Sequence, residues 1–345
     1  MGSVADQIGA LAPPERRRWL NQLARSALGA YEVHEPEVCF LGHSESISYR
    51  VDEGTVGRCL LRIHLPVSAF FDTVGGTPEA IQSELAWLDA LHSDTDIVVQ
   101  QPVRTRQGDL VSRVHIGKEQ TPAPCTVLRW VEGGRLTASP TPSQAHQLGR
   151  LVAGLHTHAS HWEPPPGFTR PSYDWDTWAA MVNKLRHAVT IGTISPSVLQ
   201  AIETAIGRIR AIVSPLGGSR QSWGLIHSDI HPGNYVTHGA ELRPIDFSLC
   251  GFGHYSFDVA DTMRYMAPST RRSFLEGYQA VRELREGSQR LLEVFFILGM
   301  IRNLAFLSLN PEDQPAMREE ARDDPDSIDS RLDRFLQGRS FLFEV

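Results

Sequence analysis

The stretch GLIHSDIHPGN, residues 224–234, places His227, Asp229 and His231 at alternate positions and ends in a Pro-Gly turn. In an extended segment alternate side chains point to the same side, so these three side chains could bind one metal ion. The alternative is a catalytic loop built around Asp229. The residues that follow the loop discriminate between the two.

Asn234 follows Asp229 by five positions, and the segment RPIDF (243–247) places Asp246 after a short apolar run. Phosphoryl transfer needs a carboxylate that orients the attacking hydroxyl and accepts its proton, and oxygen ligands for Mg²⁺. The spacing His-x-Asp-x-x-x-x-Asn, followed by Asp-Phe, supplies these groups on two adjacent loops. A zinc site would need a further ligand and would leave Asn234 and Asp246 unexplained. The sequence therefore favours a catalytic loop.

Together with PIDFSLCGFGHYSFDVAD (244–261), this loop resembles the aminoglycoside phosphotransferase and choline kinase superfamily, which has a protein-kinase-like fold. Further segments are similar to the branch that contains bacterial stress-response Ser/Thr kinases: CLLRIHLP (59–66), SELAWLDAL (83–91), GRLVAGLHTHA (149–159) and FTRP (168–171). The resemblance covers most of the chain.

The resemblance implies roles for five residues of this sequence. Asp229 is expected to be the catalytic base, and Asn234 and Asp246 are expected to bind Mg²⁺ against ATP. His227 would brace the loop through hydrogen bonds, and Asp258 would hold it through bonds to its backbone. A charge at a helix N-terminus is an equally plausible physical reading of Asp258.

The chain is predicted to be an α+β protein with the two lobes of a protein-kinase-like fold. Residues 1–127 form the nucleotide-binding lobe, an antiparallel sheet with one main helix, and residues 128–345 form the hinge and a mostly helical catalytic and substrate lobe. Strands are expected within 46–66, 97–103, 109–117 and 125–134, and helices over 13–30, 78–92, 142–159, 173–190, 196–213 and several segments beyond 257. The mixed charge run 318–335 is expected to be a solvated helical surface.

The nucleotide phosphates need a cation, and the strand CLLRIH offers Arg62 in place of the lysine that kinases use. At helical spacing Glu84 falls on the apolar face of its helix, so its carboxylate requires a partner, for which Arg62 is the candidate. Considered singly, Arg62 would be a surface strand residue and Glu84 a helix edge. Other expected nucleotide contacts are Ser44 and Ser46 in LGHSESISYRV (41–51), and the segment Leu128–Val131 against the adenine.

The acceptor pocket is expected among the helices of the second lobe. PSYDWDTW (171–178) combines Asp174, Trp175 and Asp176 with a second tryptophan, a set that suits a ring-bearing or cationic compound. The alternative is a helix start with aromatic packing. Later helices add three further candidates of the same kind: Tyr278, Glu276 and Arg302.

Composition excludes several classes of protein. A formal net charge of −7 argues against a general nucleic-acid binder and mildly favours a cationic or neutral partner. The apolar run VFFILGMI (294–301) is too short for a membrane span and predicts a buried helix. No secretory signal is visible, and the four cysteines are far apart, so we expect a cytoplasmic protein with reduced thiols and no membrane partner. The oligomeric state is not indicated.

Three functions remain open from the sequence. The catalytic set directly supports an O-phosphotransferase for a small molecule such as an antibiotic, sugar or amino alcohol. A protein Ser/Thr kinase fits the branch resemblance, but the Ala-Pro-Glu segment is missing. A nucleotide-binding pseudokinase is permitted by the missing lysine and by Ser248, which stands where relatives often carry an acid or glycine. The presence of Asp229, Asn234 and Asp246 argues against the pseudokinase.

Overall fold

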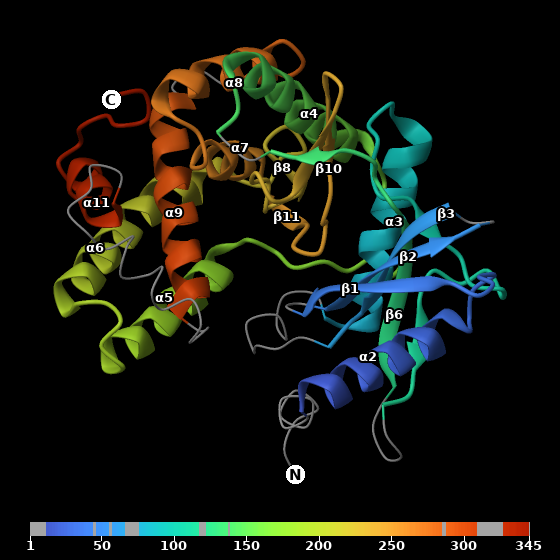
Figure 1. The fold of residues 1–345 in the computed structure, drawn as a ribbon. Coiled ribbons are helices and arrows are strands. Elements are labelled where there is room, and N and C mark those ends of the chain that lie inside the picture. The colour runs from blue at the N-terminus through green and yellow to red at the C-terminus, as the bar shows by residue number, and fades with distance from the viewer. Residues whose placement is uncertain are drawn as a thin grey trace. The chain divides into compact units, whose positions relative to one another are not determined.

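The structure is a computed structural model, and it describes residues 12–43, 46–54, 57–65, 76–116, 122–136, 139–284, 288–308 and 327–344. The chain forms two compact units. The first comprises Met1–Glu132 with Pro164–Arg170, and the second comprises Gly133–Glu163 with Pro171–Val345. Figure 1 shows that the first unit carries the larger sheet and the second most of the helices. The α+β class with an N-terminal antiparallel sheet is therefore confirmed.

The sheet of the first unit is antiparallel in every pairing, in the order β1-β2-β3-β6-β4, with β5 also paired to β6. Its strands are β1 (Glu37–His43), β2 (Ile47–Glu53), β3 (Gly57–Ile63), β4 (Pro102–Val103), β5 (Ser112–Val114) and β6 (Ala123–Arg129). The strands predicted over 97–103 and 109–117 are therefore much shorter than expected. One reason is Pro102, which has no N–H to give to a ladder and suits only a sheet edge.

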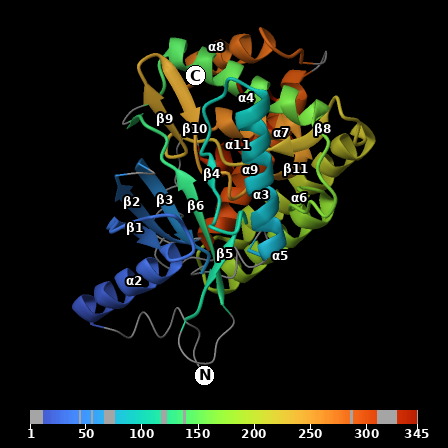
Figure 2. The same ribbon diagram turned by 90° about the vertical axis from the view of Figure 1, so that its right-hand side faces the viewer.

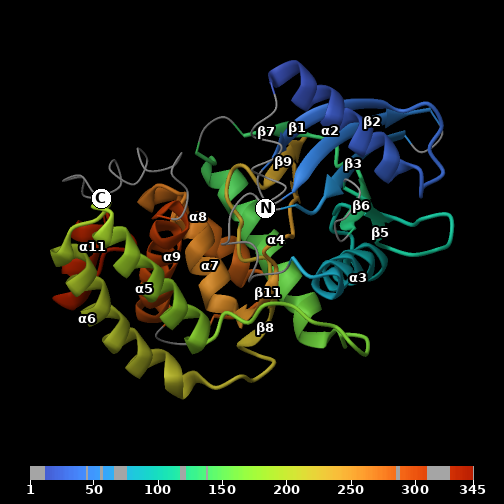
Figure 3. The same ribbon diagram turned by 90° about the horizontal axis from the view of Figure 1, so that it is seen from below.

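Two helices cover opposite faces of this sheet. Helix α2 (Pro13–Leu28) packs Leu20, Leu23 and Ala24 into one core with residues of β2 and β3, including Tyr49 and Leu61. Side chains alternate along a strand, so Arg62 faces the other way, toward helix α3 (Pro78–Asp94). Figures 2 and 3 show α2 and α3 with the strands of the first unit.

Helix α3 begins where the sequence predicts, with Pro78 in its first turn and the Thr77 hydroxyl accepting the N–H of Ala80. The segment 164–170 packs onto it. The N–H of Thr169 donates to the Ser83 hydroxyl at 2.9 Å, and the Arg170 guanidinium donates to the carbonyl of Ala80 at 2.9 Å. These bonds explain why a segment from far along the chain belongs to the first unit.

The second unit is mostly helical, as predicted. Its helices are α4 (Pro142–His161), α5 (Trp175–Thr190), α6 (Pro196–Val213), α7 (Tyr255–Met263), α8 (Pro268–Gln279), α9 (Ser288–Ser308) and α11 (Ile328–Leu336), with the 3₁₀ turn η2 (Ser214–Leu216). Two small antiparallel sheets consist of β7 (Gly134–Arg135), β9 (Tyr235–His238) and β10 (Glu241–Pro244), and of β8 (Trp223–Ile226) with β11 (Gly251–His254). These short strands position the loops described below.

Helix α9 contains the predicted buried apolar run. By length and composition it could cross a membrane, but 72% of its most apolar 18-residue stretch is buried inside the structure. This burial is typical of a core helix.

Helix α11 corrects the prediction for the charge run 318–335. Residues 318–326 lie outside the described residues, and the part that is described has a buried face made by Ile328, Leu332 and Phe335. The run therefore includes a packed amphipathic helix and is not a wholly solvated surface.

Helices α4 and α8 approach each other closely because each has a glycine at the contact. A Cβ atom on Gly149 would overlap the carbonyl oxygen of Phe274, and one on Gly277 would overlap the carbonyl oxygen of His146. Gly207 in α6 is different, since a Cβ there would meet no atom within 4 Å.

We expect Gly149→Ala to lower the free energy of unfolding by about 2 kcal/mol or more, because the added methyl forces the two helices apart. The matched control Gly207→Ala should raise the free energy of unfolding by about 0.5–1 kcal/mol, because alanine restricts the unfolded chain without a clash. Urea denaturation of both variants and the wild type measures the difference. Equal stability of the two variants would contradict this packing.

Candidate active site

The loop that carries His227, Asp229 and Asn234 connects β8 to β9 and is anchored at both ends. β8 pairs with β11 and β9 pairs with β10, so the strands on either side are held by their ladders. Within the loop Ser228 has a φ of +68°, in the left-handed region that residues with side chains rarely adopt. Such a conformation requires support from the surrounding structure.

Asp258 in α7 holds the start of this loop. Its Oδ2 accepts the N–H of His227 at 3.0 Å, and its Oδ1 accepts the N–H of Ser228 at 2.7 Å. These are the backbone hydrogen bonds that the resemblance implies for Asp258. The residue is only 1% exposed, so its carboxylate acts inside the protein.

A buried histidine and tyrosine complete the support behind Asp258. His156 Nε2 lies 3.0 Å from Asp258 Oδ2, and His156 Nδ1 lies 2.9 Å from the Tyr278 hydroxyl. The bonding pattern assigns the proton to Nε2, so that Nδ1 accepts from Tyr278. Burial lowers the pKa of His156, although the neighbouring Asp258 opposes this shift, and the imidazole is therefore neutral at pH 7. Burial alone would raise the pKa of Asp258. The bond to His156, the nearby charges and the N–H groups outweigh this effect and lower the pKa, so the carboxylate is ionised.

Arg302 in α9 approaches the loop from another side. Its Nη1 donates to the Ser228 carbonyl at 2.5 Å and to the Ser228 hydroxyl at 2.6 Å, while its Nη2 donates to Asp261 Oδ2 at 2.7 Å. Arg264 donates to the other oxygen of Asp261 at 2.8 Å. Ser228 is therefore held by Asp258 at its N–H and by Arg302 at its C=O.

The hydrogen bonds to Ser228 fix the position of the next residue, Asp229, and of its carboxylate. Its Oδ2 accepts the side-chain N–H of Asn234 at 2.7 Å, and its Oδ1 lies 3.9 Å from Arg302 Nη2. Its side chain remains 24% exposed, so a reactant can reach it. Burial raises the pKa of Asp229, but His231 and the charge of Arg302 outweigh this effect and leave the pKa lowered, so the carboxylate is ionised at neutral pH.

The three side chains of the opening triplet do not converge on one point. His227 Nε2 lies 3.1 Å from the carbonyl oxygen of Ile245, and the His231 ring accepts the N–H of Gly233 at Nδ1. Within the described residues no group of three or more His, Cys, Asp or Glu side chains could hold a metal ion. His227 instead ties the loop to the segment that leads into Asp246.

Asn234 and Asp246 are joined through the main chain, because the N–H of Ile245 donates to the carbonyl of Asn234 at 2.9 Å. The side-chain nitrogen of Asn234 faces Asp229, so its carbonyl oxygen is the atom left for a cation. Asp246 has a φ of +61°, and its Oδ1 lies 3.4 Å from the backbone nitrogen of Ser248, whose N–H donates to it. An amide oxygen and a carboxylate are the hard oxygen ligands that Mg²⁺ prefers, so the donor set fits this ion.

In the first unit the predicted ion pair between Arg62 and Glu84 is present. Arg62 Nη2 lies 2.5 Å from Glu84 Oε1, and the two side chains are 6% and 2% exposed. An unpaired charge at such a depth would be costly, so each residue needs the other. The alternatives, a surface strand residue for Arg62 and a helix edge for Glu84, are therefore wrong, because both side chains are buried.

The other expected nucleotide contacts are placed as follows. Ser44 lies outside the described residues. The Ser46 hydroxyl is buried and lies 3.1 Å from the Ser48 hydroxyl. Leu128 is a fully buried residue of β6, and Val131 follows the end of this strand. Their roles toward a nucleotide stay predictions.

The acceptor candidates need correction. Tyr278 is 1% exposed with its hydroxyl on His156, so it supports the loop from behind and cannot line an open acceptor pocket. Asp174 caps helix α5 by accepting the N–H of Thr177 at 3.2 Å, which is the helix-start alternative. Trp175 lies under the Arg210 guanidinium at 5.0 Å, and Asp176 is exposed in the first turn of α5. No acceptor pocket can be assigned from these residues.

Sequence reasoning missed the supporting roles of three residues. Arg302 was expected on the acceptor side, whereas the structure places it against the backbone of Ser228. Asp261 and His156 were not singled out. Asp261 follows Asp258 by three positions on α7, which puts both carboxylates on neighbouring turns of one helix, and this spacing was the available signal.

Comparisons with known proteins agree with this fold. The sequence profile described as the phosphotransferase enzyme family matches residues 37–293. Amicoumacin kinase from Bacillus subtilis (strain 168) is 23% identical over 244 residues, which cover 69% of this chain and 66%, just under two thirds, of that relative. The solved structure of a microcompartment-associated aminopropanol kinase is 25% identical with a TM-score of 0.73, covering 92% of this chain and 98% of that one.

A second solved structure, an amicoumacin kinase in complex with AMP-PNP and Ca²⁺, shares the fold with a TM-score of 0.72 at 17% identity. It covers 94% of this chain and 96% of that one. The chain belongs to the phosphotransferase enzyme family. The resemblance drawn from the catalytic loop is confirmed at the level of the superfamily.

The neutral, buried His156 predicts a pH dependence of stability. Its pKa is lower in the folded chain than in the unfolded chain, so the unfolded state takes up a proton first as the pH falls below about 6.5. Its contribution is therefore fully present above pH 6.5 and is lost on acidification. Between pH 7 and pH 5, the free energy of unfolding of the wild type should therefore fall by about 1 kcal/mol more than that of His156→Gln.

The control is His161→Gln, an exposed histidine on the same helix. It should keep the pH slope of the wild type, since the other buried histidines are unchanged in both variants. Chemical denaturation at pH 7, 6 and 5 gives the slopes. A wild-type slope in His156→Gln would mean that His156 is protonated in the folded protein.

Proposed function

We propose that this enzyme is an ATP- and Mg²⁺-dependent O-phosphotransferase that transfers the γ-phosphate to a hydroxyl group of a small molecule, with Asp229 as the base. The observation that carries the proposal is the state of Asp229. Its carboxylate is ionised, reachable and fixed by the bonds that Asp258 and Arg302 make to Ser228. A fixed, ionised carboxylate is what the attacking hydroxyl requires.

Asp229 accepts a hydrogen bond from the acceptor hydroxyl and directs its oxygen toward the γ-phosphorus. As the oxygen–phosphorus bond forms, the bond from the γ-phosphorus to the bridging oxygen of ATP breaks, and ADP leaves with that oxygen. The hydroxyl proton passes to the carboxylate of Asp229. Because Asn234 donates to Oδ2, the carboxylate keeps one direction while it accepts this proton.

Asn234 and Asp246 would hold the Mg²⁺ ion, which when bound neutralises charge on the phosphates. His227 supports this pair by bonding the carbonyl of Ile245, the residue before Asp246. On the first unit Arg62 is proposed to bind phosphate oxygens, with Glu84 fixing its guanidinium. Ser44, Ser46, Leu128 and Val131 complete the proposed nucleotide contacts.

For the acceptor we propose a small molecule that carries both an amine and a hydroxyl group. Two similarities support this class: the aminopropanol kinase, with the same fold at 25% identity, and a choline kinase from Cryptosporidium parvum with a TM-score of 0.61. The net charge of −7 also favours a cationic partner. The four cysteines are free thiols, which supports the proposed cytoplasmic location.

The acceptor class is tested by incubating the enzyme with Mg-ATP and single compounds, and following phosphorylated products by mass spectrometry. The compounds are 1-amino-2-propanol, choline and spectinomycin, with 1,2-propanediol as the amine-free counterpart of aminopropanol. We expect phosphate on at least one amine-bearing compound and none on the diol. Phosphoproteins formed from a cell lysate, with no phosphorylated small molecule, would instead identify a protein kinase, and no transfer at all would identify a pseudokinase.

The role of Asp229 is tested by Asp229→Asn, which keeps the shape and removes the proton acceptor. We expect kcat to fall by about a thousand-fold while the Kd for Mg-ATP changes little, because the base acts on the acceptor. Calorimetry with a non-hydrolysable ATP analogue measures the Kd. The control Asp333→Asn removes an exposed carboxylate from α11 and should leave kcat unchanged. Turnover above a tenth of the wild type in Asp229→Asn would disprove its role as base.

A further inference from the structure

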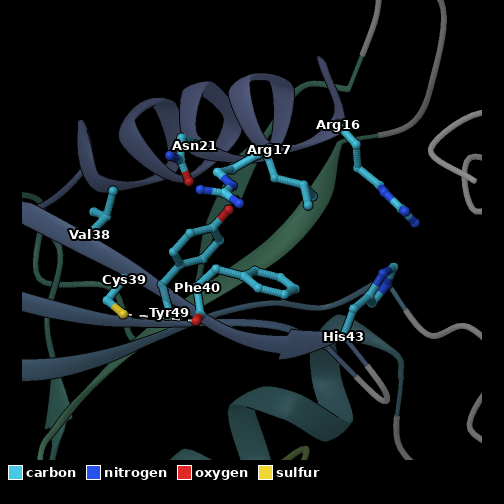
Figure 4. Close-up of a pocket in the computed structure, with 9 residues that line it drawn as sticks. Arg16, Arg17, Asn21, Val38, Cys39, Phe40, His43 and Tyr49 are labelled. Atoms are coloured by element: carbon cyan, nitrogen blue, oxygen red, sulfur yellow. Dashed lines mark hydrogen bonds between the residues drawn. The ribbon is translucent and has the colours of Figure 1, made fainter. Parts of the chain in front are cut away.

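A cavity lies within the first unit, between helix α2 and strands β1 and β2. Its volume is about 780 Å³, within the range of small-molecule sites. Figure 4 shows Arg17 and Asn21 on α2 above the ring of Tyr49, with Phe40 and His43 on the strand below. The lining residues are Arg16, Arg17, Leu20, Asn21, Val38, Cys39, Phe40, His43 and Tyr49.

The charge at this cavity is positive, in contrast to the whole chain. Arg16 and Arg17 are exposed and adjacent on α2, and within the described residues neither has a hydrogen bond or an ion pair with another side chain. His43 is occupied through its Nε2, which donates to the carbonyl of Leu65 at 2.8 Å. Two uncompensated guanidinium groups on a protein of net charge −7 create a local preference for an anion.

The floor of the cavity contains a polar atom without a partner. Tyr49 is 0% exposed, and its hydroxyl makes no hydrogen bond among the described residues. Leaving a buried hydroxyl unsatisfied costs about 1–3 kcal/mol, so such groups normally have a function or a ligand. Burial also raises the pKa of Tyr49, so the hydroxyl keeps its proton and can only gain by donating it to an acceptor.

The rest of the lining is apolar. Leu20, Val38 and the ring of Phe40 line the cavity, and Phe40 meets Tyr49 edge to face with ring centroids 5.6 Å apart. Phe40 is 43% exposed, so within the described part of the chain part of its ring is open to solvent. An inorganic anion would use the arginines but would leave this apolar surface in water.

We propose that the cavity between α2 and β1 binds a small organic anion, whose acidic group pairs with Arg16 and Arg17 while its apolar body packs on Phe40 and Leu20. On binding, the anion displaces the side chains that cover the Tyr49 hydroxyl, which then donates a hydrogen bond to the acidic group. The site lies entirely within the first unit and shares no residue with the proposed phosphotransferase machinery. It therefore goes beyond the proposed function and does not depend on it.

The test uses a fluorescent aromatic sulfonate, 8-anilinonaphthalene-1-sulfonate, titrated into the full-length protein with saturating Mg-ATP present to occupy the nucleotide site. We expect one saturable site. The uncharged parent compound, N-phenyl-1-naphthylamine, should bind at least about ten-fold more weakly because it cannot use the arginines or Tyr49.

Two sets of variants locate the site. Tyr49→Phe keeps the ring and removes only the hydroxyl, so the sulfonate should bind about ten-fold more weakly. Arg16→Gln combined with Arg17→Gln should weaken it by at least the same factor. The matched control combines Arg18→Gln with Arg25→Gln, which removes the same charge from exposed positions of α2 outside the cavity lining and should keep the wild-type affinity.

A thermal melt separates loss of binding from loss of folding. Without the sulfonate, Tyr49→Phe should melt at or above the wild-type temperature, because among the residues that the structure describes the buried hydroxyl has no partner to lose. With the sulfonate, the wild type should gain more in Tm than this variant. Unchanged affinity in Tyr49→Phe, equal loss in the two arginine pairs, or equal binding of the uncharged compound would each overturn the proposal.

Discussion

The hydrogen bonds to Ser228 set the conformation of the catalytic loop. Asp258 accepts the N–H of this residue and Arg302 donates to its carbonyl, so helices α7 and α9 hold the same peptide unit from different directions. A left-handed residue with a side chain costs roughly 1–2 kcal/mol in isolation. These bonds offset that cost, and the direction of the Asp229 carboxylate follows from the backbone they impose on the preceding residue.

Each buried charge of this support has a defined counterpart. Arg302 pairs with Asp261, Asp258 bonds to a neutral histidine and two N–H groups, and in the first unit Arg62 pairs with Glu84. Removing one member of such a pair leaves an uncompensated charge and commonly costs about 3–5 kcal/mol. Replacing both members by well-packed apolar residues is often neutral, so the pairs are weak evidence for stability. They explain how carboxylates can remain ionised and fixed in direction inside the protein.

The sequence predicted the elements of the fold better than the contacts of individual side chains. Helices 142–159 and 196–213 were correct to within a few residues because proline at the start and apolar spacing mark a helix locally. The prediction of a strand over 97–103 is wrong for most of that segment, because a strand needs a paired neighbour and, among the described residues, only Pro102–Val103 has one. Tyr278 was misplaced for a related reason: a helix position shows which face is buried, but not whether that face meets a substrate or another side chain.

The sequence by itself determined the α+β class, the phosphotransferase superfamily and the two loops that carry Asp229, Asn234 and Asp246, because the chemistry requires these residue types at nearly fixed spacing on adjacent segments. It also predicted the pairing of Arg62 with Glu84, since a carboxylate on an apolar helix face needs a cation, and the structure confirms this pair. Only the tertiary structure decided that Arg302, Asp261, His156 and Tyr278 support the loop, and that the Tyr49 hydroxyl makes no hydrogen bond within the described part of the chain. These relations join residues far apart in the chain, and no local spacing encodes which buried polar atoms will meet.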